Sequence, residues 1–408
     1  MGEKPPAWLP ASIGGAARRG KASDDDLLTG EAWSHLLDHL ENAASALASS
    51  RAPSAPLEQA AGYRHLLVLL ALGIDEALRP VDPYAPRIRP GNVDAVLKWG
   101  MDCPDALYCG SPVRADAVYR LHGRRGTARY VGLQVMAGME TTANVVVDEN
   151  PFEIVLSAER LSDSKTRWMP LANNANSLVV RQFFYGWSTE EPASFEIELV
   201  SGGPAPAAAG TPSGPSAIAR QLEALGEFVD ASARFWLDIE EMGRSQGLNV
   251  FRPPANRTDM GGAEENVTTW GSWELKDDEA LLIEVTPPPA LYWSVALGNF
   301  WWETLDYANR QTSLNGHQAV LDGDGVFRAV VAHEDPGVAN WLDTTGFSCG
   351  PMIFRWLQAD SAPVPSTRAV KCKELDAALP ASTARVSTEE RANVLAARRA
   401  GVHRRFPR

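Results

Sequence analysis

The sequence has little of what metal centres, disulfide scaffolds and nucleic-acid interfaces require. Only four cysteines, at positions 103, 109, 349 and 372, and seven histidines occur in 408 residues, and the cysteines follow neither a CxxC nor a zinc-finger spacing. We therefore expect reduced thiols and no bound metal. With 38 Lys and Arg against 51 Asp and Glu, the net charge is −13, whereas nucleic acids and anionic membrane surfaces attract basic faces. Neither is an expected partner.

Signature motifs of the large cofactor-dependent families are missing as well. The sequence contains no GxGxxG, GxxxxGK[ST], GxSxG or HExxH motif and no complete EF-hand loop. We therefore expect no cofactor. No apolar run approaches the ~18 residues that a membrane-spanning helix needs, and residues 1–26 lack the apolar core of a signal peptide. The expected location is the cytoplasm, away from membranes.

Strand-and-turn patterning dominates what the sequence does contain. Short runs alternate apolar and polar residues, and Gly, Pro and Asn separate them. An Asp-Gly-Asp-Gly sequence at 322–325 is typical of a tight hairpin turn. The pattern predicts a mostly β fold, with two antiparallel sheets in a jelly-roll-like sandwich. The runs are 117–122, 128–135, 142–147, 152–157, 178–185, 195–200, 267–275, 280–285 and 291–297.

Helical periodicity is confined to a few segments. Apolar residues recur at helical spacing over 33–47 and 57–78, which predicts an N-terminal helical pair, and over 216–242, which predicts a long helix inserted between two strand sets. A basic amphipathic helix is expected at 387–399. The predicted organisation is a loose N-terminus (1–26), a helical segment (27–90), a first β-rich half (91–200), a linker rich in Gly, Ala, Pro and Ser (201–215), a helix and turn-rich insertion (216–265), a second β-rich half (266–360) and a C-terminal extension with a helix (361–408).

A series of motifs in the second β-rich half resembles a bacterial family. The series runs Tyr292-Trp293-Ser294, Asn309-Arg310, Ser313, Asp322-Gly-Asp-Gly, Asp335-Pro336-Gly337, Asn340-Trp341-Leu342 and Phe354-Arg355-Trp356. It is similar to the family known only as domain of unknown function 1214, clearly over about 284–357 and more weakly upstream. The resemblance implies a β-sandwich and no particular activity. One departure is Phe347, where the family pattern has a His after Thr345-Gly346.

Aromatic, amide and cationic side chains gather in the connection before the predicted hairpin. Planar aromatic rings stack against sugars or apolar skeletons, and Arg and Asn donors hold hydroxyl or carboxylate groups. The same residues are equally compatible with a sandwich core, in which Arg310 pairs with an internal acid such as Asp306. The candidate ligand-binding residues are Trp301, Trp302, Tyr307, Asn309, Ser313, Asn340 and Trp341, with Arg181 and Tyr185 as an opposite wall.

Acid–base groups in the same stretch supply a catalytic hypothesis. If the protein is an enzyme, Asp306 or Asp335 is the predicted base, and His317 or His333 is the predicted acid. Arg310 would hold an anionic group of the substrate. His317, His333 and Asp335 could instead share a metal ion, or simply form a solvated strand end.

Together these observations predict a cytoplasmic bacterial protein that binds a small, partly apolar molecule carrying hydroxyl or carboxylate groups. A hydrolase or lyase that needs no cofactor fits this description. So does a non-catalytic carbohydrate- or lipid-binding protein, or an assembly protein. The sequence leaves the choice open, and it leaves a homo-oligomer open too.

Overall fold

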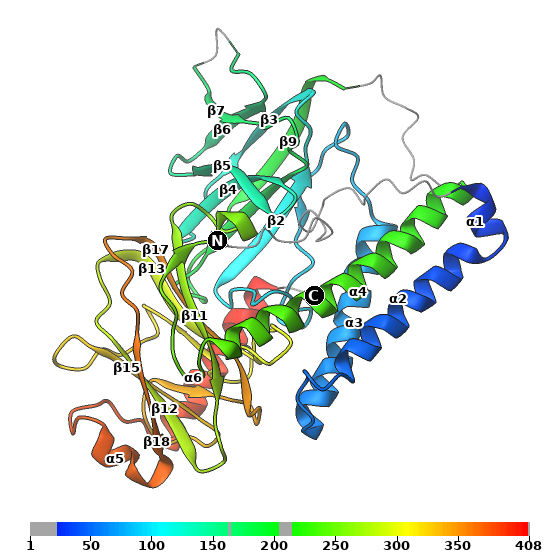
Figure 1. Cartoon of the computed structure of the whole chain (residues 1–408). Helices are drawn as coiled ribbons and strands as arrows, with labels where there is room; N and C mark the ends of the chain where they lie inside the picture. The colour runs from blue at the N-terminus through cyan, green and yellow to red at the C-terminus, as the bar shows by residue number, and fades with distance from the viewer. Residues whose placement is uncertain (1–22, 162–164, 204–213, 407–408) are drawn as a thin grey trace.

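The computed structural model describes residues 23–161, 165–203 and 214–406. Within these ranges the chain forms two sets of strands separated by a long helix, α4 (Pro215–Ser245), with further helices at both ends (Figure 1). The predicted mostly β fold with N-terminal helices and an inserted long helix is therefore confirmed. Most of the predicted loose N-terminus (1–26) and of the predicted linker (201–215) lies outside the described residues.

The first strand set forms two sheets that pack face to face. Sheet A has the order β1-β2-β8-β4-β5, and sheet B has the order β7-β6-β3-β9. Alternation along β4 sends Val131, Leu133 and Val135 into the shared core, where they meet Tyr119 and Leu121 from β3. The strands are β1 (Arg89–Pro90), β2 (Ala106–Pro112), β3 (Ala117–Arg124), β4 (Tyr130–Ala137), β5 (Glu140–Val146), β6 (Phe152–Ser157), β7 (Arg167–Pro170), β8 (Ser177–Phe183) and β9 (Ser194–Gly202).

The second strand set repeats this layout. Sheet C has the order β10-β11-β17-β13-β14, and sheet D has the order β16-β15-β12-β18. Phe354 and Trp356 of β17 pack against Ile283 of β12 and Phe327 of β15 in one core. The strands are β10 (Ala255–Asn256), β11 (Asn266–Glu274), β12 (Glu279–Val285), β13 (Ala290–Leu297), β14 (Ser313–Asn315), β15 (Phe327–Ala332), β16 (Trp341–Asp343), β17 (Cys349–Ala359) and β18 (Ser366–Lys371). In the described part of the chain, no sheet mixes strands from the two sets.

Helices α1 (Asp24–Leu28), α2 (Glu31–Leu47) and α3 (Pro56–Leu78) lie alongside α4 (Figure 1). Pro56 occupies the first turn of α3, where its missing N–H costs nothing. Apolar faces of α2, α3 and α4 share a core with Trp301 of the second strand set. Gly62 makes this contact feasible, because a Cβ there would stand 2.7 Å from the Trp301 ring. The helices are thereby fixed to the second sandwich.

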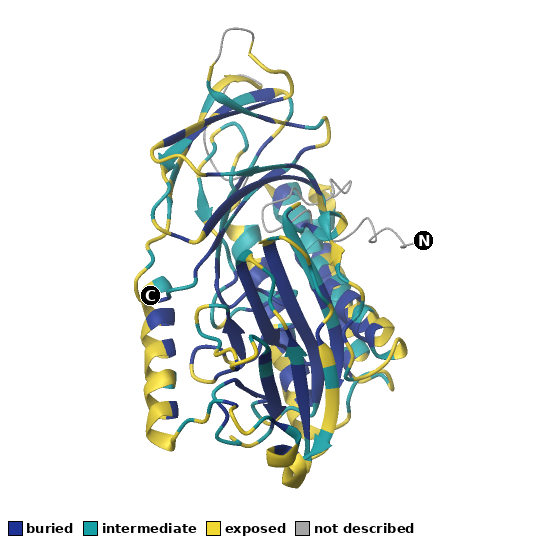
Figure 2. Cartoon of the chain, turned by 90° about the vertical axis from the view of Figure 1, so that its left-hand side faces the viewer, coloured by how far each residue is buried: buried dark blue, intermediate teal, exposed yellow. Residues whose placement is uncertain are grey.

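The C-terminal extension joins both sandwiches. Its strand β18 extends sheet D, and helix α6 (Thr388–Arg405) begins with a capping box at Ser387 and Glu390. Figure 2 shows this helix with one buried and one exposed side. Arg391 and Arg398 are on its buried side. The remaining helical segments are short and are η1 (Thr258–Met260), η2 (Cys372–Glu374) and α5 (Leu375–Ala378). No helix in the described ranges is both long and apolar enough to cross a bilayer.

Sheets A and C turn their outer faces toward each other. Tyr130 and Phe183 from sheet A and Tyr292 and Leu357 from sheet C form a buried apolar cluster between the sandwiches. Beside it, the buried Asp105 carboxylate links the two halves through hydrogen bonds to side chains of both. The space between these two outer faces holds the candidate site.

Candidate functional site

A cavity of about 300 Å³ lies between the outer faces of sheets A and C, bounded on one side by α4. A volume of this size is at the small end of the range for small-molecule sites. Because one molecule occupies about 30 Å³ in liquid water, the cavity has room for on the order of ten water molecules. Its principal walls are Tyr108 and Arg181 from sheet A, Trp270 and Arg355 from sheet C, Trp236 from α4, and Trp302.

Strand alternation explains why two arginines face this cavity. On β17, Phe354 and Trp356 point into the core of the second sandwich, so Arg355 between them points out of it. On β8, Val180 points into the first core, and Arg181 takes the opposite face. Packing the two sandwiches together brings these outward faces to a common space.

Arg355 is buried without a direct ion pair. The residue is 7% exposed, its Nη2 donates to the Met101 carbonyl oxygen at 2.6 Å, and its Nη1 is buried with no hydrogen-bond partner. Among the described residues, no carboxylate lies within ion-pair distance of Arg355 or of Arg181. Arg181 donates to Gln134 Oε1, and burial lowers the pKa of its guanidinium. The cavity therefore presents two desolvated cations that an anionic group could satisfy.

Four indole rings line the cavity beside the arginines. Trp236 stacks on Trp302 with ring centroids 5.1 Å apart and planes 17° apart, and Trp270 meets Trp302 edge-on at 4.8 Å. Trp99 meets Trp236 edge-on at 5.1 Å. This wall is suited to a flat apolar or aromatic group.

Besides Glu76, which pairs with Arg89 at 3.1 Å, one further carboxyl group lines the cavity, that of Asp102. It is 7% exposed, and its Oδ1 accepts a hydrogen bond from Thr304 Oγ1 at 2.8 Å. Burial raises the pKa of Asp102 to about 6, against the opposing attraction of Lys98. Burial likewise raises the pKa of the nearby Tyr108 phenol to about 12, so that it stays protonated at neutral pH. Asp102 is thus a lining carboxyl group whose pKa is close to neutrality.

The backbone beneath Asp102 is held in an unfavourable conformation. Met101 has φ of 53° and Trp302 has φ of 60°, values that residues with a side chain seldom adopt. The Met101 amide donates to the Trp302 carbonyl at 2.7 Å, so the two strained residues are joined directly. Such outliers gather at functional sites, where the surrounding fold maintains them.

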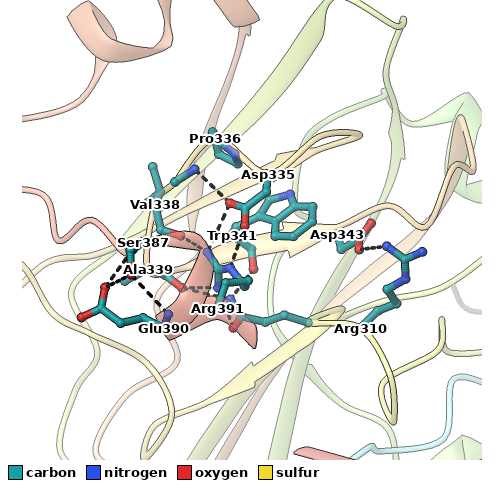
Figure 3. A network of polar contacts seen from close by, with 12 residues as sticks. Arg310, Asp335, Pro336, Val338, Ala339, Trp341, Asp343, Ser387, Glu390 and Arg391 are labelled. Atoms are coloured by element: carbon teal, nitrogen blue, oxygen red, sulfur yellow. Dashed lines mark hydrogen bonds and ion pairs between the residues drawn. The ribbon is translucent and has the colours of Figure 1, made fainter. Parts of the chain in front are cut away.

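Only two of the sequence-predicted site residues, Arg181 and Trp302, line this cavity. The predicted catalytic residues lie outside the cavity and apart from one another. Asp335 accepts hydrogen bonds from Arg391, with Nε at 2.9 Å, and Arg310 pairs with Asp343 at 3.3 Å, as Figure 3 shows. Arg310 therefore has an acidic partner, as in the alternative that placed these residues in a sandwich core. That partner is Asp343 rather than Asp306.

The remaining catalytic candidates are separate from one another as well. Asp306 is exposed and accepts from the Asn309 side chain at 3.0 Å. His317 is exposed and stacks loosely on Tyr185, with centroids 6.5 Å apart. His333 Nδ1 lies 2.8 Å from Thr344 Oγ1. Within the described residues, no three His, Cys, Asp or Glu side chains come close enough together to hold a metal ion. The geometry supports neither the shared acid–base site nor the His317, His333 and Asp335 metal site.

Most predicted ligand-binding residues stabilise the fold instead. Trp301 Nε1 donates to the Glu58 carbonyl at 2.9 Å, and Trp341 Nε1 donates to the Ala332 carbonyl at 3.0 Å. Their rings are buried. Tyr307 is buried beneath the Lys98 ammonium, which lies 4.4 Å from its ring centroid.

The polar ligand candidates are occupied in the same way. Asn340 donates to the carbonyls of Val320 and Arg328 at 2.6 and 2.9 Å. Ser313 accepts from Arg398 Nη2 at 2.9 Å, and Tyr185 OH accepts from the Trp293 amide at 3.0 Å. These side chains form hydrogen bonds within the protein and do not line the cavity. The structure therefore does not place them on a common binding surface.

Sequence reasoning missed Asp102, Arg355 and the α4 residue Trp236. A signal for Arg355 was present, because a cation between two core aromatics on a strand must face away from that core. Asp102 has no comparable local signal. Its place depends on contacts with Thr304 and Lys98 that only the folded chain provides.

Comparison with solved structures identifies a relative. An uncharacterised protein from Burkholderia cenocepacia is 31% identical in sequence, and its structure superposes with a TM-score of 0.78. The match covers 88% of this chain and 100% of that one. The chain belongs to the same family as that protein. The relative shares the fold over its full length, but its description assigns no activity.

Two further solved structures are much more distant. The VPA0106 protein from Vibrio parahaemolyticus is 13% identical, with 76% of this chain and 98% of that chain covered and a TM-score of 0.45. A salicylate 1,2-dioxygenase from Pseudaminobacter salicylatoxidans is 11% identical, with 77% and 84% covered and a TM-score of 0.20. Neither carries an argument about this chain. No protein-family model and no curated protein matches it.

Proposed function

We propose that the protein binds a small molecule with a flat apolar body and an anionic group, in the cavity between sheets A and C. The observation that carries this proposal is Arg355, a buried guanidinium whose Nη1 has no partner and which faces the cavity without an ion pair. The proposed setting is the bacterial cytoplasm. The four cysteines are free thiols, as that setting requires.

An anionic ligand follows from the cost of burying charge. A guanidinium removed from water without a partner is expensive, and charge-assisted hydrogen bonds to a carboxylate recover much of that cost. Arg181 supplies a second cation on the facing sheet. Two guanidiniums on opposite walls favour a planar anion such as a carboxylate, because each can donate to a different oxygen.

An apolar, ring-containing body follows from the indole wall. Trp236, Trp270 and Trp302 present flat apolar surface beside the arginines, and an aromatic or similarly flat ligand can stack there. The proposed ligand belongs to the class expected from the sequence, a partly apolar molecule with hydroxyl or carboxylate groups. Its place is the inter-sheet cavity rather than the 301–341 stretch. The resemblance to domain of unknown function 1214 stays a prediction.

Ligand binding is tested by titrating the tryptophan fluorescence with phenylacetate, phenylacetamide and benzylamine. We expect the carboxylate to bind, and the neutral and cationic probes to bind at least about 10-fold more weakly, since a charge-assisted hydrogen bond contributes roughly 1.5–3 kcal/mol. Arg355→Gln should reduce phenylacetate affinity by a similar factor. Arg399→Gln, at an exposed arginine of α6, is the matched control and should have no effect. Equal binding of all three probes, or unchanged binding by Arg355→Gln, would contradict the proposal.

A second candidate function is self-assembly, which an exposed apolar stripe on α3 favours. Tyr63, Leu67, Ile74 and Leu78 recur at helical spacing, and Leu67 and Leu78 are 67% and 68% exposed. Contiguous exposed apolar surface often marks a protein interface. Light scattering after size exclusion would detect a dimer, and Leu67→Asp should dissociate it. A monomer at micromolar concentration would exclude this candidate.

A further inference from the structure

We propose that the cavity is a proton-transfer site, in which Asp102 removes a proton from the carbon beside the carbonyl of an aromatic 2-oxo acid. Arg355 would hold the resulting enolate oxygen, and Arg181 would hold the carboxylate. This inference rests on the proposed anion-binding function and adds to it a reaction, a base and a substrate class.

Asp102 has spare hydrogen-bonding capacity that the neighbouring buried aspartate lacks. In the described part of the chain, the one hydrogen bond to its carboxylate comes from Thr304 and reaches Oδ1. Asp105, three residues later, accepts from Trp187 Nε1, Tyr292 OH and Asn315 Nδ2 at 2.6–2.7 Å. Asp105 does not line the cavity, whereas Asp102 does. The other lining carboxylate, Glu76, is paired with Arg89 at 3.1 Å, so Asp102 is the carboxylate placed to accept a proton from a ligand.

The charges around Asp102 suit a base that works near neutral pH. Burial weakens its acidity, while Lys98, Arg355 and Thr304 favour its ionised form and the neighbouring Glu303 opposes it. Lys98 itself is held by the carbonyls of Thr304 and Leu305, at 2.8 and 2.6 Å, so it does not neutralise Asp102 by a direct ion pair. With its pKa raised to about 6, the carboxylate is ionised at pH 7 and more basic than an exposed aspartate.

The backbone links the residue before Asp102 to the anion-binding arginine. Met101, immediately before it, donates its amide to the Trp302 carbonyl and accepts from Arg355 Nη2 at its own carbonyl. The guanidinium that would stabilise the enolate is thus anchored to the residue preceding the base. Such mutual support gives the fixed geometry that proton transfer requires.

The proposed reaction balances without any co-reactant. The C–H bond breaks, and its proton forms an O–H bond with the Asp102 carboxylate. The released electron pair forms a carbon–carbon double bond, and the carbonyl π pair moves to oxygen, which Arg355 stabilises as an enolate. Asp102 then returns the proton to the enolate oxygen, giving the enol, or to the carbon, giving the starting ketone. The net change is keto–enol tautomerisation.

Covalent catalysis by a cavity thiol is a weaker alternative. Cys109 lines the cavity, but burial raises the pKa of its thiol to about 12. Burial also raises the pKa of Cys103, whose Sγ lies 3.4 Å from Tyr292 OH. Both remain protonated at neutral pH, and a protonated thiol is a poor nucleophile. The carboxylate is the better-placed reactive group.

The test is α-proton exchange of phenylpyruvate and 2-oxo-4-phenylbutanoate in D₂O, followed by NMR against a buffer blank. We expect the full-length protein to accelerate exchange of at least one of them, and Asp102→Asn to slow it by at least about 100-fold. Asp102→Asn should bind phenylacetate at least as tightly as wild type, because the change removes a negative charge from the cavity wall. Asp277→Asn, at an exposed aspartate outside the cavity, is the matched control and should exchange at the wild-type rate.

The pH profile provides a second measurement. The logarithm of kcat/KM should rise with slope one and level off above about pH 6, because Asp102 must be ionised to act. This rise should vanish in Asp102→Asn. Phenylacetate binding without exchange of either oxo acid would overturn the proton-transfer inference and leave the binding proposal intact. Exchange by Asp102→Asn at the wild-type rate would overturn the assignment of the base, whereas failure of all three acids to bind would overturn both proposals.

Discussion

The main-chain amide of Met101 donates a hydrogen bond to the carbonyl of Trp302 at 2.7 Å, and both residues have positive φ. Met101 precedes the candidate base, and Trp302 is part of the indole wall. Two strained residues from distant parts of the chain thus support each other at the cavity. The surrounding packing must supply the free energy that keeps them there. The site should accordingly be sensitive to small changes in that packing.

Gly100 provides a direct test of this sensitivity. Its φ is +63°, and a Cβ would stand 2.8 Å from the Trp236 ring, so Gly100→Ala adds a clash to the cost of a left-handed alanine. We expect a loss of about 2–4 kcal/mol in unfolding free energy. Gly30→Ala is the control, because φ there is +82° but no atom lies within 4 Å. Urea denaturation should show about 1–2 kcal/mol for the control. Equal losses would mean that the Trp236 contact is unimportant.

Arg355 and Arg391 should respond oppositely to replacement by methionine. Arg355 has no ion pair, so Arg355→Met should leave stability within about 1 kcal/mol of wild type or raise it, while anion binding is lost. Arg391 pairs with Asp335 and donates to the Val338 and Ala339 carbonyls (Figure 3). Arg391→Met should cost about 3 kcal/mol. Thermal unfolding of the two variants in parallel would reveal the contrast, and a large loss in Arg355→Met would indicate a structural role.

Glu240 makes stability depend on pH. It is fully buried below Trp302, whose Nε1 donates to Oε2 at 3.1 Å, and burial raises the pKa of its carboxyl to about 7 from an ordinary 4.5. Between these values the unfolded chain binds fewer protons than the native one, so this group lowers stability as pH rises from 4.5 to 7. The shift corresponds to about 3 kcal/mol.

The matched variants for this effect are Glu240→Gln and Glu227→Gln on the same helix. Glu240→Gln cannot ionise, so its unfolding free energy relative to wild type should increase by about 3 kcal/mol between pH 4.5 and 8. Glu227 is exposed, and its replacement should give a flat difference. Urea titrations at several pH values measure both. A flat profile for Glu240→Gln would mean that the native carboxyl ionises without penalty.

Local patterns were sufficient to predict most elements of the fold. The helical spacing over 57–78 matches α3, and the alternating run over 152–157 matches β6. The central strand β17 was missed for a physical reason. Its residues from Cys349 to Leu357 are buried on both faces, so the run does not alternate, and Gly350-Pro351 near its start is typical of a turn.

The candidate site could be predicted only in part. Clustering in the sequence predicted a site within 301–341, but aromatic and polar residues of this segment form internal contacts of the fold. The cavity instead depends on how two sandwiches pack, which brings Arg181 and Arg355 to facing walls. Neither local periodicity nor spacing contains that long-range relationship. Arg181, a cation on an aromatic-rich strand, is conspicuous in the sequence, and it does line the cavity.

The Asp105 carboxylate should be a major determinant of how firmly the two sandwiches are joined. It accepts from Trp187 in the first half and from Tyr292 and Asn315 in the second, and it is 1% exposed. Asp105→Ala would remove the short-range acceptor of three buried donors, so we expect a loss of at least about 3 kcal/mol. Tyr292→Phe removes one donor and should cost about 1 kcal/mol.

Because these contacts bridge the strand sets, Asp105→Ala should also change how unfolding proceeds. We expect one urea transition for the wild type and two for the variant, since the sandwiches have separate cores. Tyr84→Phe, whose hydroxyl reaches the exposed Asp116, is the control and should keep a single transition within about 0.5 kcal/mol of wild type. Circular dichroism and tryptophan fluorescence together would resolve the two steps. A single, equally stable transition in Asp105→Ala would show that apolar contacts such as Phe183 with Tyr292, at 5.0 Å between centroids, suffice to couple the halves.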